Sequence, residues 1–324
     1  MFLLLLSLAH GGYGDAVDGI PTYIEREVHL WTNSVRSDPA GFELDYPCGT
    51  GAFSPDQLTP KMPLYWHGSL GEAARVHSDD MYVNDFFSHN SSDGTSSGNR
   101  VSQYYAHPSG ENIAVGYPSA WAAVLDGWMC SSGHRANIMN SDYNDFGAGV
   151  VSQYYTQNFG IRPFTEDAYA ARTGMHFPQW PNATAEYRVS VYTVDGPPAE
   201  VRVVANGVPH ALEVLHGAPD NGVYSADLDV DQTWSCTAYW FEVETASGRV
   251  DQFPAEGAYG FGDCPWTDVD ARWITRDAVP ALADLDTALP DTEEPGGCGC
   301  THSPQPLAGW VVGLFGAMLL RRRL

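Results

Sequence analysis

The 324-residue sequence predicts an α+β protein in which a first region of mixed helices and strands precedes a small antiparallel β-sandwich. In the first region, apolar residues recur at helical spacing from Ile24 to Val35, and Asp38-Pro39 marks the end of this helix. From about residue 185, short alternating runs are separated by Asp-Gly and Asn-Gly turns, as is typical of antiparallel hairpins. An apolar segment near the C-terminus follows as a separate tag.

A second helix is expected to begin near Ser69. Ser69 and Glu72 have the spacing of a capping box, in which each side chain bonds the backbone N–H of the other residue. The helix would bury Leu70, His77 and Met81. We therefore expect His77 to be a core histidine rather than a ligand.

A third helix and a strand complete the first region. Trp121, Leu125 and Trp128 make the apolar face of this helix, and Gly133-His134 falls at its end, where a histidine can interact with the helix C-terminus. Residues 148–159 alternate in polarity and are rich in β-formers, so they are expected to form a strand.

The second folded region, residues 180–265, is expected to be immunoglobulin-like or fibronectin-like in outline and to act as a spacer or a ligand-binding module. Its alternating runs lie at 187–192, 199–204, 222–228 and 238–244. Asp227, Asp229 and Asp231 fall on one face of a strand. They could form a calcium site, but a solvated strand edge is the interpretation that we favour.

The N-terminal segment, residues 1–19, contains a short apolar run from Phe2 to Ala9 followed by small residues, and we interpret it as a secretory signal peptide. A buried first strand is the alternative. The run lacks the usual positively charged start, so the true N-terminus could lie upstream.

The C-terminal segment, residues 301–324, is expected to be a hydrophobic and arginine-ended sorting tag. The apolar run Leu307–Leu320 would give about 21 Å of helix, which is short of the ~30 Å hydrocarbon core of a membrane. Cys298 and Cys300 precede it, and residues 266–300 have the composition of a disordered linker. The arrangement resembles myxobacterial-type sorting tags, which implies export, membrane association before processing, and display on or release from the cell surface. A plain tail anchor, with a transmembrane helix, is the alternative.

Net charge and cysteine content limit the functions that this sequence could have. Forty acidic residues against 16 basic residues give a net charge of −24, which argues against a nucleic-acid partner because no basic stripe is available for phosphates. Six cysteines in an exported chain favour disulfides within each region. We expect a Cys236–Cys264 bridge, and a Cys48–Cys130 bridge is a further candidate although nothing in the sequence shows that these two positions meet.

Two motifs carry the strongest functional signal, and they are Gly110 to Ala114 and Trp128 to Ile138. They present Glu111 and His134, while His89 stands 22 residues before Glu111. Two imidazoles and a carboxylate from three segments could bind a divalent metal or exchange protons.

These motifs, in this order, resemble the bacterial branch of the CAP superfamily, the cysteine-rich secretory or SCP-like proteins. The matching segments run across roughly residues 20–165: Asn33 and Arg36, Leu64-Tyr65-Trp66, His77-Ser78 with Met81, Ser88-His89, Asp93-Gly94, Gly110 to Ala114, Trp128 to Ile138, and Tyr154 to Gly160. The resemblance implies an α-β-α sandwich for this region.

The resemblance also implies a cavity with two histidines and two glutamates, which holds zinc in some family members. His89 and Glu111 match the first histidine and the first glutamate, whereas Ser131 and Tyr154 stand where the second pair is expected. Our hypothesis is that His134 refills the cavity, so that His89, Glu111 and His134 could bind Zn²⁺ and leave a fourth position open for water.

Two functions remain open from the sequence. The first, which we favour, is a non-catalytic module that binds a lipid, glycan or other cell-envelope ligand through groove aromatics such as Tyr104 or Tyr105. The second is an exported hydrolase that uses the same three residues, with or without zinc, or with Ser88, Ser131 or Ser132 as the nucleophile. A purely structural hydrogen-bonded network is the simplest interpretation of the cluster, and Arg135 and Asn137 are expected to bind nearby carbonyl groups.

Overall fold

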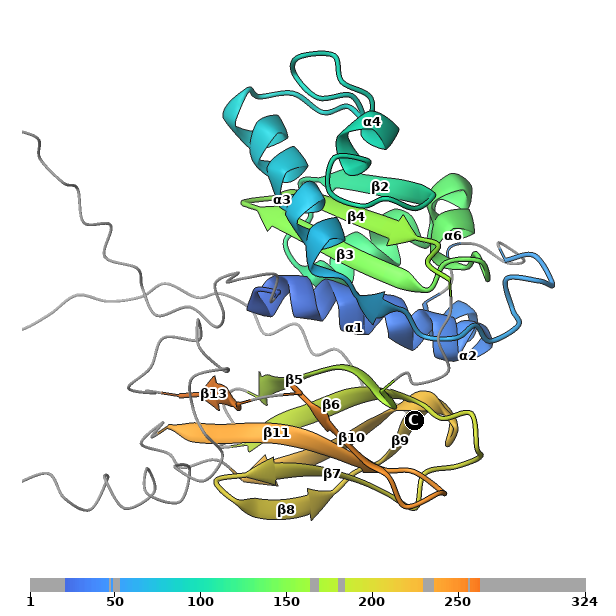
Figure 1. Cartoon of the computed structure of the whole chain (residues 1–324), viewed down its shortest axis with the longest axis vertical. Coiled ribbons are helices and arrows are strands. Elements are labelled where there is room, and N and C mark those ends of the chain that lie inside the picture. The colour runs from blue at the N-terminus through green and yellow to red at the C-terminus, as the bar shows by residue number, and fades with distance from the viewer. Residues whose placement is uncertain are drawn as a thin grey trace, which may run out of the picture. The chain divides into compact units, whose positions relative to one another are not determined.

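Helix α1 (Tyr23–Ser37) lies between the two halves of the computed structural model (Figure 1). The structure describes residues 21–46, 48, 53–163, 169–179, 184–229, 236–255 and 257–262, all within one compact unit. Thr22 and Glu25 form a capping box at the start of α1. The helix ends at Ser37 with Asp38 as its C-cap, which confirms the predicted end at Asp38-Pro39. The helix is buried on nearly every side because protein packs against two of its faces.

The first half contains one four-stranded sheet covered by helices. Its strands are β1 (Tyr65–Trp66), β2 (Ser109–Val115), β3 (Asp145–Val151) and β4 (Tyr154–Gly160), in the order β1-β3-β4-β2. β1 is parallel to β3, and the other pairs are antiparallel. The helical elements are α1, α2 (Pro39–Asp45), α3 (Gly68–Val83), α4 (Ser97–Val101), α5 (Ala120–Ala122), the π-helical turn η1 (Ala123–Trp128) and α6 (Ser132–Ile138).

Alternation along β3 places helices on both faces of this sheet. Phe146 and Ala148 belong to a core that includes Val28 of α1. Gly147 and Gly149 face α3 so closely that an added Cβ would lie 2.1 Å from a backbone nitrogen of that helix in each case. Only glycine permits this contact, and the close packing fixes α3 and the loop that follows it.

Two helix predictions need correction. His67, not Ser69, is the N-cap of α3, and no side chain caps this end, so the predicted capping box is wrong. The third helix ends earlier than expected, at Trp128, and His134 belongs to the separate helix α6. His77 is fully buried on α3, as expected.

The second half consists of two antiparallel sheets around one core. The first sheet contains β5 (Ala171–Gln179), β6 (Thr184–Tyr192), β10 (Asn221–Asp229) and β9 (Glu213–Ala218). The second contains β12 (Val250–Phe253), β11 (Thr237–Glu244), β7 (Glu200–Ala205) and β8 (Val208–Ala211), with β13 (Tyr259–Phe261) paired to β11. Mixed helix and strand content is confirmed, whereas the immunoglobulin-like or fibronectin-like identity stays a prediction.

The two halves share a small apolar contact and several hydrogen bonds. Leu30 of α1 packs with Met175 and Val223 of the first sheet. The Ser37 hydroxyl donates to Asn221 at 3.0 Å, and the Asn221 side chain donates to the backbone carbonyl of Lys61 at 3.2 Å. Helix α1 therefore contributes to the core of the first half and also packs against the first sheet of the second half.

The predicted Cys48–Cys130 disulfide is present, with 4.9 Å between the Cα atoms. Cys236 is also disulfide-bonded, while its predicted partner, Cys264, lies outside the described residues. Asp227, one of the three aspartates considered for a calcium site, accepts a hydrogen bond from Gln179 at 2.7 Å. Asp231, another of the three, lies outside the described residues.

The predicted signal peptide (1–19), linker (266–300) and sorting segment (301–324) lie outside the described residues. Among the residues that the structure does describe, no helix is both long and apolar enough to span a bilayer.

Candidate functional site

His89, Arg100 and Glu111 meet at the edge of the first sheet. Glu111 lies on β2, Arg100 on α4, and His89 in the loop between α3 and α4. Nδ1 of His89 donates to one Glu111 oxygen at 2.8 Å, and Nη2 of Arg100 forms an ion pair with the other. The side chains of Glu111 and Arg100 are only 4% and 5% exposed, whereas that of His89 is 51% exposed. A buried carboxylate is therefore paired with a buried guanidinium, and the imidazole covers them from the solvent side.

Arg100 also holds the loop that carries His89. Its Nη1 donates to the backbone carbonyl of His89 at 3.2 Å and to the Ser91 hydroxyl at 2.8 Å. Asp80 of α3 fixes the same loop from the other side, because it accepts from the Ser92 N–H at 2.8 Å and from its hydroxyl at 2.6 Å. One ion pair thus connects β2 with the whole loop between α3 and α4.

His134 lies near this cluster without joining it. Burial, and then the nearby charge of His89, lowers the pKa of His134. Its imidazole forms no hydrogen bond with any residue in the described part of the chain, whereas its backbone carbonyl accepts from Asn112 at 3.1 Å. The structure therefore joins His89 to Glu111, with His134 close by.

Amide side chains connect α6 to the sheet. Asn137 donates to the backbone carbonyl of Glu111 at 3.1 Å and to the Asn112 side chain at 2.8 Å. Nη1 of Arg135 donates to the backbone carbonyl of Met129 at 2.5 Å. These contacts confirm the predicted structural role of Arg135 and Asn137.

The three predicted metal ligands do not form a ligand cluster in this arrangement. Within the described residues, no group of three or more His, Cys, Asp or Glu side chains is placed to hold a metal ion. Both oxygens of Glu111 are already engaged, and a metal ion there would face the Arg100 guanidinium. The arrangement does not fit zinc as it stands, and the zinc site stays a prediction.

The predicted serine nucleophiles are not paired with the histidines. The Ser88 hydroxyl accepts a hydrogen bond from the Asn90 N–H at 3.1 Å. The backbone carbonyl of Ser88 accepts one from Nε2 of His77 at 2.9 Å. Ser131 is the N-cap of α6 without a side-chain capping bond. Across the described residues, no serine hydroxyl bonds His89 or His134, so the nucleophile–base contact of a serine hydrolase is not formed.

A pocket of about 370 Å³ lies beside this network, between α3, the loop and α4. We call it the loop pocket, and its walls include Asp79, Asp80, Asp93, Arg100 and Tyr104. Sequence reasoning missed both Arg100 and the three carboxylates. The only signal was the Asp93-Gly94 turn, because the other groups converge only when the loop folds back on α3.

Of the two predicted groove aromatics, only Tyr104 lines the loop pocket. Tyr105 is buried, and its hydroxyl donates to Asp145 at 3.0 Å. The prediction for Tyr105 is wrong, since the first turn after α4 directs it into the core beside Leu70.

A comparison with known proteins gives a family match for the first half of the molecule. Residues 32–162 match the model of the cysteine-rich secretory protein family, CAP. This part of the chain is similar to CAP domains. The match covers the helices and the sheet that position Arg100 and Glu111.

Two proteins from Bacillus subtilis are similar to part of this chain. The uncharacterized membrane protein YlbC is 44% identical over 98 residues, which are 30% of this chain and 28% of YlbC. The uncharacterized protein YkwD is 34% identical over 101 residues, which are 30% of this chain and 39% of YkwD. The matched segment thus spans well under half the length of either relative.

A solved structure of an extracellular SCP-domain protein from Bacillus anthracis is also similar. It shares 30% identity and a TM-score of 0.34, and the match covers 43% of this chain and 40% of that one. The cysteine-rich secretory protein SAV1118 of Staphylococcus aureus is 16% identical with a TM-score of 0.31, over 44% of this chain and 40% of its own.

Proposed function

We propose that this chain is an exported, non-catalytic CAP-domain protein whose loop pocket binds a neutral or amine-bearing glycan of the cell envelope. The observation that carries the proposal is the wall of the pocket, where several hydrogen-bonding side chains converge around one partly buried aromatic ring, Tyr104. Sugars present many hydroxyl groups, and a site of this kind can satisfy them in a fixed orientation.

The charge of the side chains that line the loop pocket distinguishes between the classes of envelope ligand. Asp79, Asp80 and Asp93 face the pocket, while the charge of Arg100 is taken up by Glu111. Burial opposes ionisation of Asp80, but hydrogen bonds from Ser92 and Asn84 lower its pKa overall. The pocket is therefore acidic at neutral pH, which disfavours anionic lipids and favours neutral or cationic sugars.

In this proposal the His89–Arg100–Glu111 network is a scaffold for the pocket. Glu111 holds Arg100, and Arg100 holds the backbone at His89 and the side chain of Ser91. Buried networks of this kind fix one conformation when their members are paired. His89 itself is expected to matter little for glycan affinity, because its ring faces solvent rather than the pocket wall.

The test is isothermal titration of the full chain with trimers of N-acetylglucosamine and of glucosamine. We expect saturable binding, and Tyr104→Ala should weaken it by about tenfold because a buried aromatic contact is worth about 1 kcal/mol or more. Asp79→Asn should reduce the preference for the glucosamine trimer. Tyr82→Ala is the matched control, because it removes an exposed aromatic residue of α3 that does not line the loop pocket. Equal affinity of the Tyr104 and Tyr82 variants would reject the loop pocket as the site.

A hydrolase is the second candidate, and one observation favours it. The buried Glu111 orients the half-exposed ring of His89, as an acid orients a general base. Screening the full chain against ester, amide and glycoside substrates tests this. His89→Ala should abolish any turnover without unfolding the protein if His89 is the base.

Zinc binding by His89, Glu111 and His134 is tested separately. The scaffold role predicts no stoichiometric zinc in the wild type at micromolar concentration. Stoichiometric zinc that is lost in both His89→Ala and His134→Ala would instead establish the metal site, and with it a reason to pursue hydrolysis.

We further propose that residues 1–19 direct export and that residues 301–324, with Cys298 and Cys300, direct sorting at the envelope. Cell fractionation of the full chain beside a Cys298→Ala/Cys300→Ala variant tests this. Unchanged location and processing of the variant would count against the sorting tag.

A further inference from the structure

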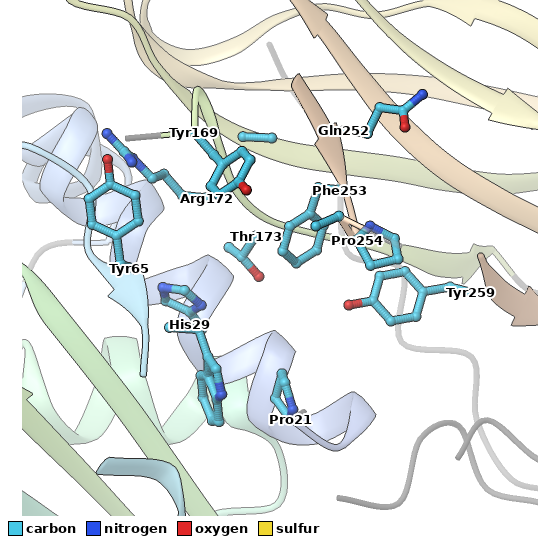
Figure 2. A pocket seen from close by; sticks show the side chains of 13 residues that line it. Pro21, His29, Tyr65, Tyr169, Arg172, Thr173, Gln252, Phe253, Pro254 and Tyr259 are labelled. Atoms are coloured by element: carbon cyan, nitrogen blue, oxygen red, sulfur yellow. The ribbon is translucent and has the colours of Figure 1, made fainter. Parts of the chain in front are cut away.

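A second cavity lies where the first half of the molecule meets the following sheets, beside the edge strand β1. We call it the interface cavity; its volume is about 250 Å³ (Figure 2). Aromatic rings form much of its wall, and they come from both halves of the molecule: Tyr65 and Trp66 of β1, and Tyr169, Phe253 and Tyr259. Pro21 and Pro254 add flat apolar surface.

Three polar side chains at this cavity have atoms that are buried but unbonded. They are Nε and Nη1 of Arg172, the hydroxyl of Thr173 and the hydroxyl of Tyr65, none of which has a hydrogen-bond partner in the described part of the chain. Figure 2 shows the Thr173 hydroxyl directed into the cavity. Buried polar groups are nearly always hydrogen-bonded, so three in one cavity indicate a missing partner.

Arg172 is the charged member of this group. It is 3% exposed, and its guanidinium lies 3.5 Å from the centre of the Tyr65 ring. Arg172 forms no ion pair with a described carboxylate. Oδ2 of the nearby Asp251 instead accepts from the Ala170 N–H at 2.6 Å and from Arg249 at 2.8 Å. Burial lowers the pKa of Arg172 to about 9, even though Tyr192 and Asp251 nearby act to raise it.

We propose that the interface cavity binds a small aromatic carboxylate. The apolar ring would lie between the aromatic side chains and prolines, where flat groups pack well. The carboxylate would accept hydrogen bonds from Arg172, with the Thr173 hydroxyl as a further donor. This ligand supplies both an anion for the buried cation and acceptors for the unbonded donors. The site is separate from the loop pocket and does not depend on the glycan proposal.

The probe is 3-phenylpropionate, titrated into the full chain by calorimetry and by ligand-observed NMR. Its neutral amide, 3-phenylpropanamide, is the matched ligand because it keeps the ring and loses the charge. A charge-assisted hydrogen bond contributes about 1.5–3 kcal/mol, so the acid should bind at least tenfold more tightly than the amide.

Three variants locate the site. Arg172→Met should remove the preference for the acid and weaken its binding by at least tenfold. Thr173→Val keeps the side-chain shape and should weaken binding severalfold. Tyr169→Ala removes an exposed wall residue and should also weaken binding, whereas Tyr82→Ala on α3 should not. Because Thr173→Val and Tyr169→Ala test the site without touching the buried cation, the proposal stays falsifiable if Arg172→Met does not fold.

Three results would overturn the proposal. The first is no binding of 3-phenylpropionate at roughly 10 mM, a concentration at which even a weakly bound small ligand is detected. This result would mean that only water hydrogen-bonds to the unbonded groups. The second is equal affinity for acid and amide. The third is unchanged affinity in Thr173→Val and Tyr169→Ala, which would place any binding elsewhere on the molecule.

Discussion

The loop pocket and the interface cavity are built in opposite ways. The loop pocket has acidic and hydroxyl-bearing walls, and its cation, Arg100, is paired with Glu111 and bonded to the loop. Only Nε of Arg100 lacks a hydrogen-bond partner among the described residues. The interface cavity has aromatic walls, and its buried cation, Arg172, has no counter-ion within bonding distance in the described chain. Arg100 thus fixes a pocket wall through its bonds, whereas two nitrogens of the buried Arg172 have no hydrogen-bond partner among the described residues.

The largest expected effect comes from breaking the scaffold of the loop pocket. Arg100→Met should lower the free energy of unfolding by about 4 kcal/mol, because it leaves the buried Glu111 without its cation. Urea unfolding of the full chain measures this. Asp56→Asn removes the exposed carboxylate that pairs with Lys61. It should cost less than about 1 kcal/mol, because Lys61 keeps its 2.9 Å bond to the backbone carbonyl of residue 56. Similar losses in the two variants would contradict the scaffold role of Arg100.

Acid should lower the free energy of unfolding through His29, a buried residue that lines the interface cavity. Burial lowers the pKa of His29 to about 4, and the carbonyl of Leu64 accepts a hydrogen bond from its Nε2. The unfolded chain protonates His29 near pH 6.5, so the stability that neutral His29 contributes is present above this pH. It is lost as pH falls from 6.5 to 4, by about 3 kcal/mol in total.

Chemical unfolding at a series of pH values tests the role of His29. The wild type should lose more stability over this interval than His29→Gln, in which a neutral amide can still donate to Leu64. Parallel pH profiles for the two proteins would show that His29 does not titrate as proposed.

A smaller effect is expected at the contact between the two halves. Val223→Ala should cost about 2 kcal/mol, because Val223 is fully buried against Leu30 and Met175. Val83→Ala, at an exposed position on α3, should change stability by less than about 0.5 kcal/mol. Thermal unfolding compares the two. Equal stability would mean that the halves do not support each other through this contact.

The smallest effect separates the two sites by function. Tyr169→Ala should change stability by less than about 0.5 kcal/mol, because this side chain is mostly exposed. It should nevertheless weaken 3-phenylpropionate binding and leave binding of the amino-sugar trimers unchanged. A parallel loss of both ligands would show that the two sites are not independent.

Sequence reasoning found the parts of this molecule that short motifs encode. The helical spacing from Ile24 to Val35 predicted α1. The family-like motifs selected His89 and Glu111 as candidate site residues, and these two side chains do meet. It missed Arg100, because an arginine in a Ser- and Asn-rich loop carries no local signal of pairing with a carboxylate 11 residues away. The interface cavity was also missed, since Tyr65 and Arg172 are separated by more than a hundred residues and meet only by tertiary packing.

Hydrogen exchange of the full chain, with and without the trimer of N-acetylglucosamine, is the decisive test of glycan binding in the loop pocket. If the loop pocket is the glycan site, exchange should slow across residues 84–104, which form the loop and α4, while residues 169–173 at the interface cavity stay unchanged. Unaltered exchange across 84–104 at a saturating concentration of the trimer, or slowing confined to 169–173, would contradict it.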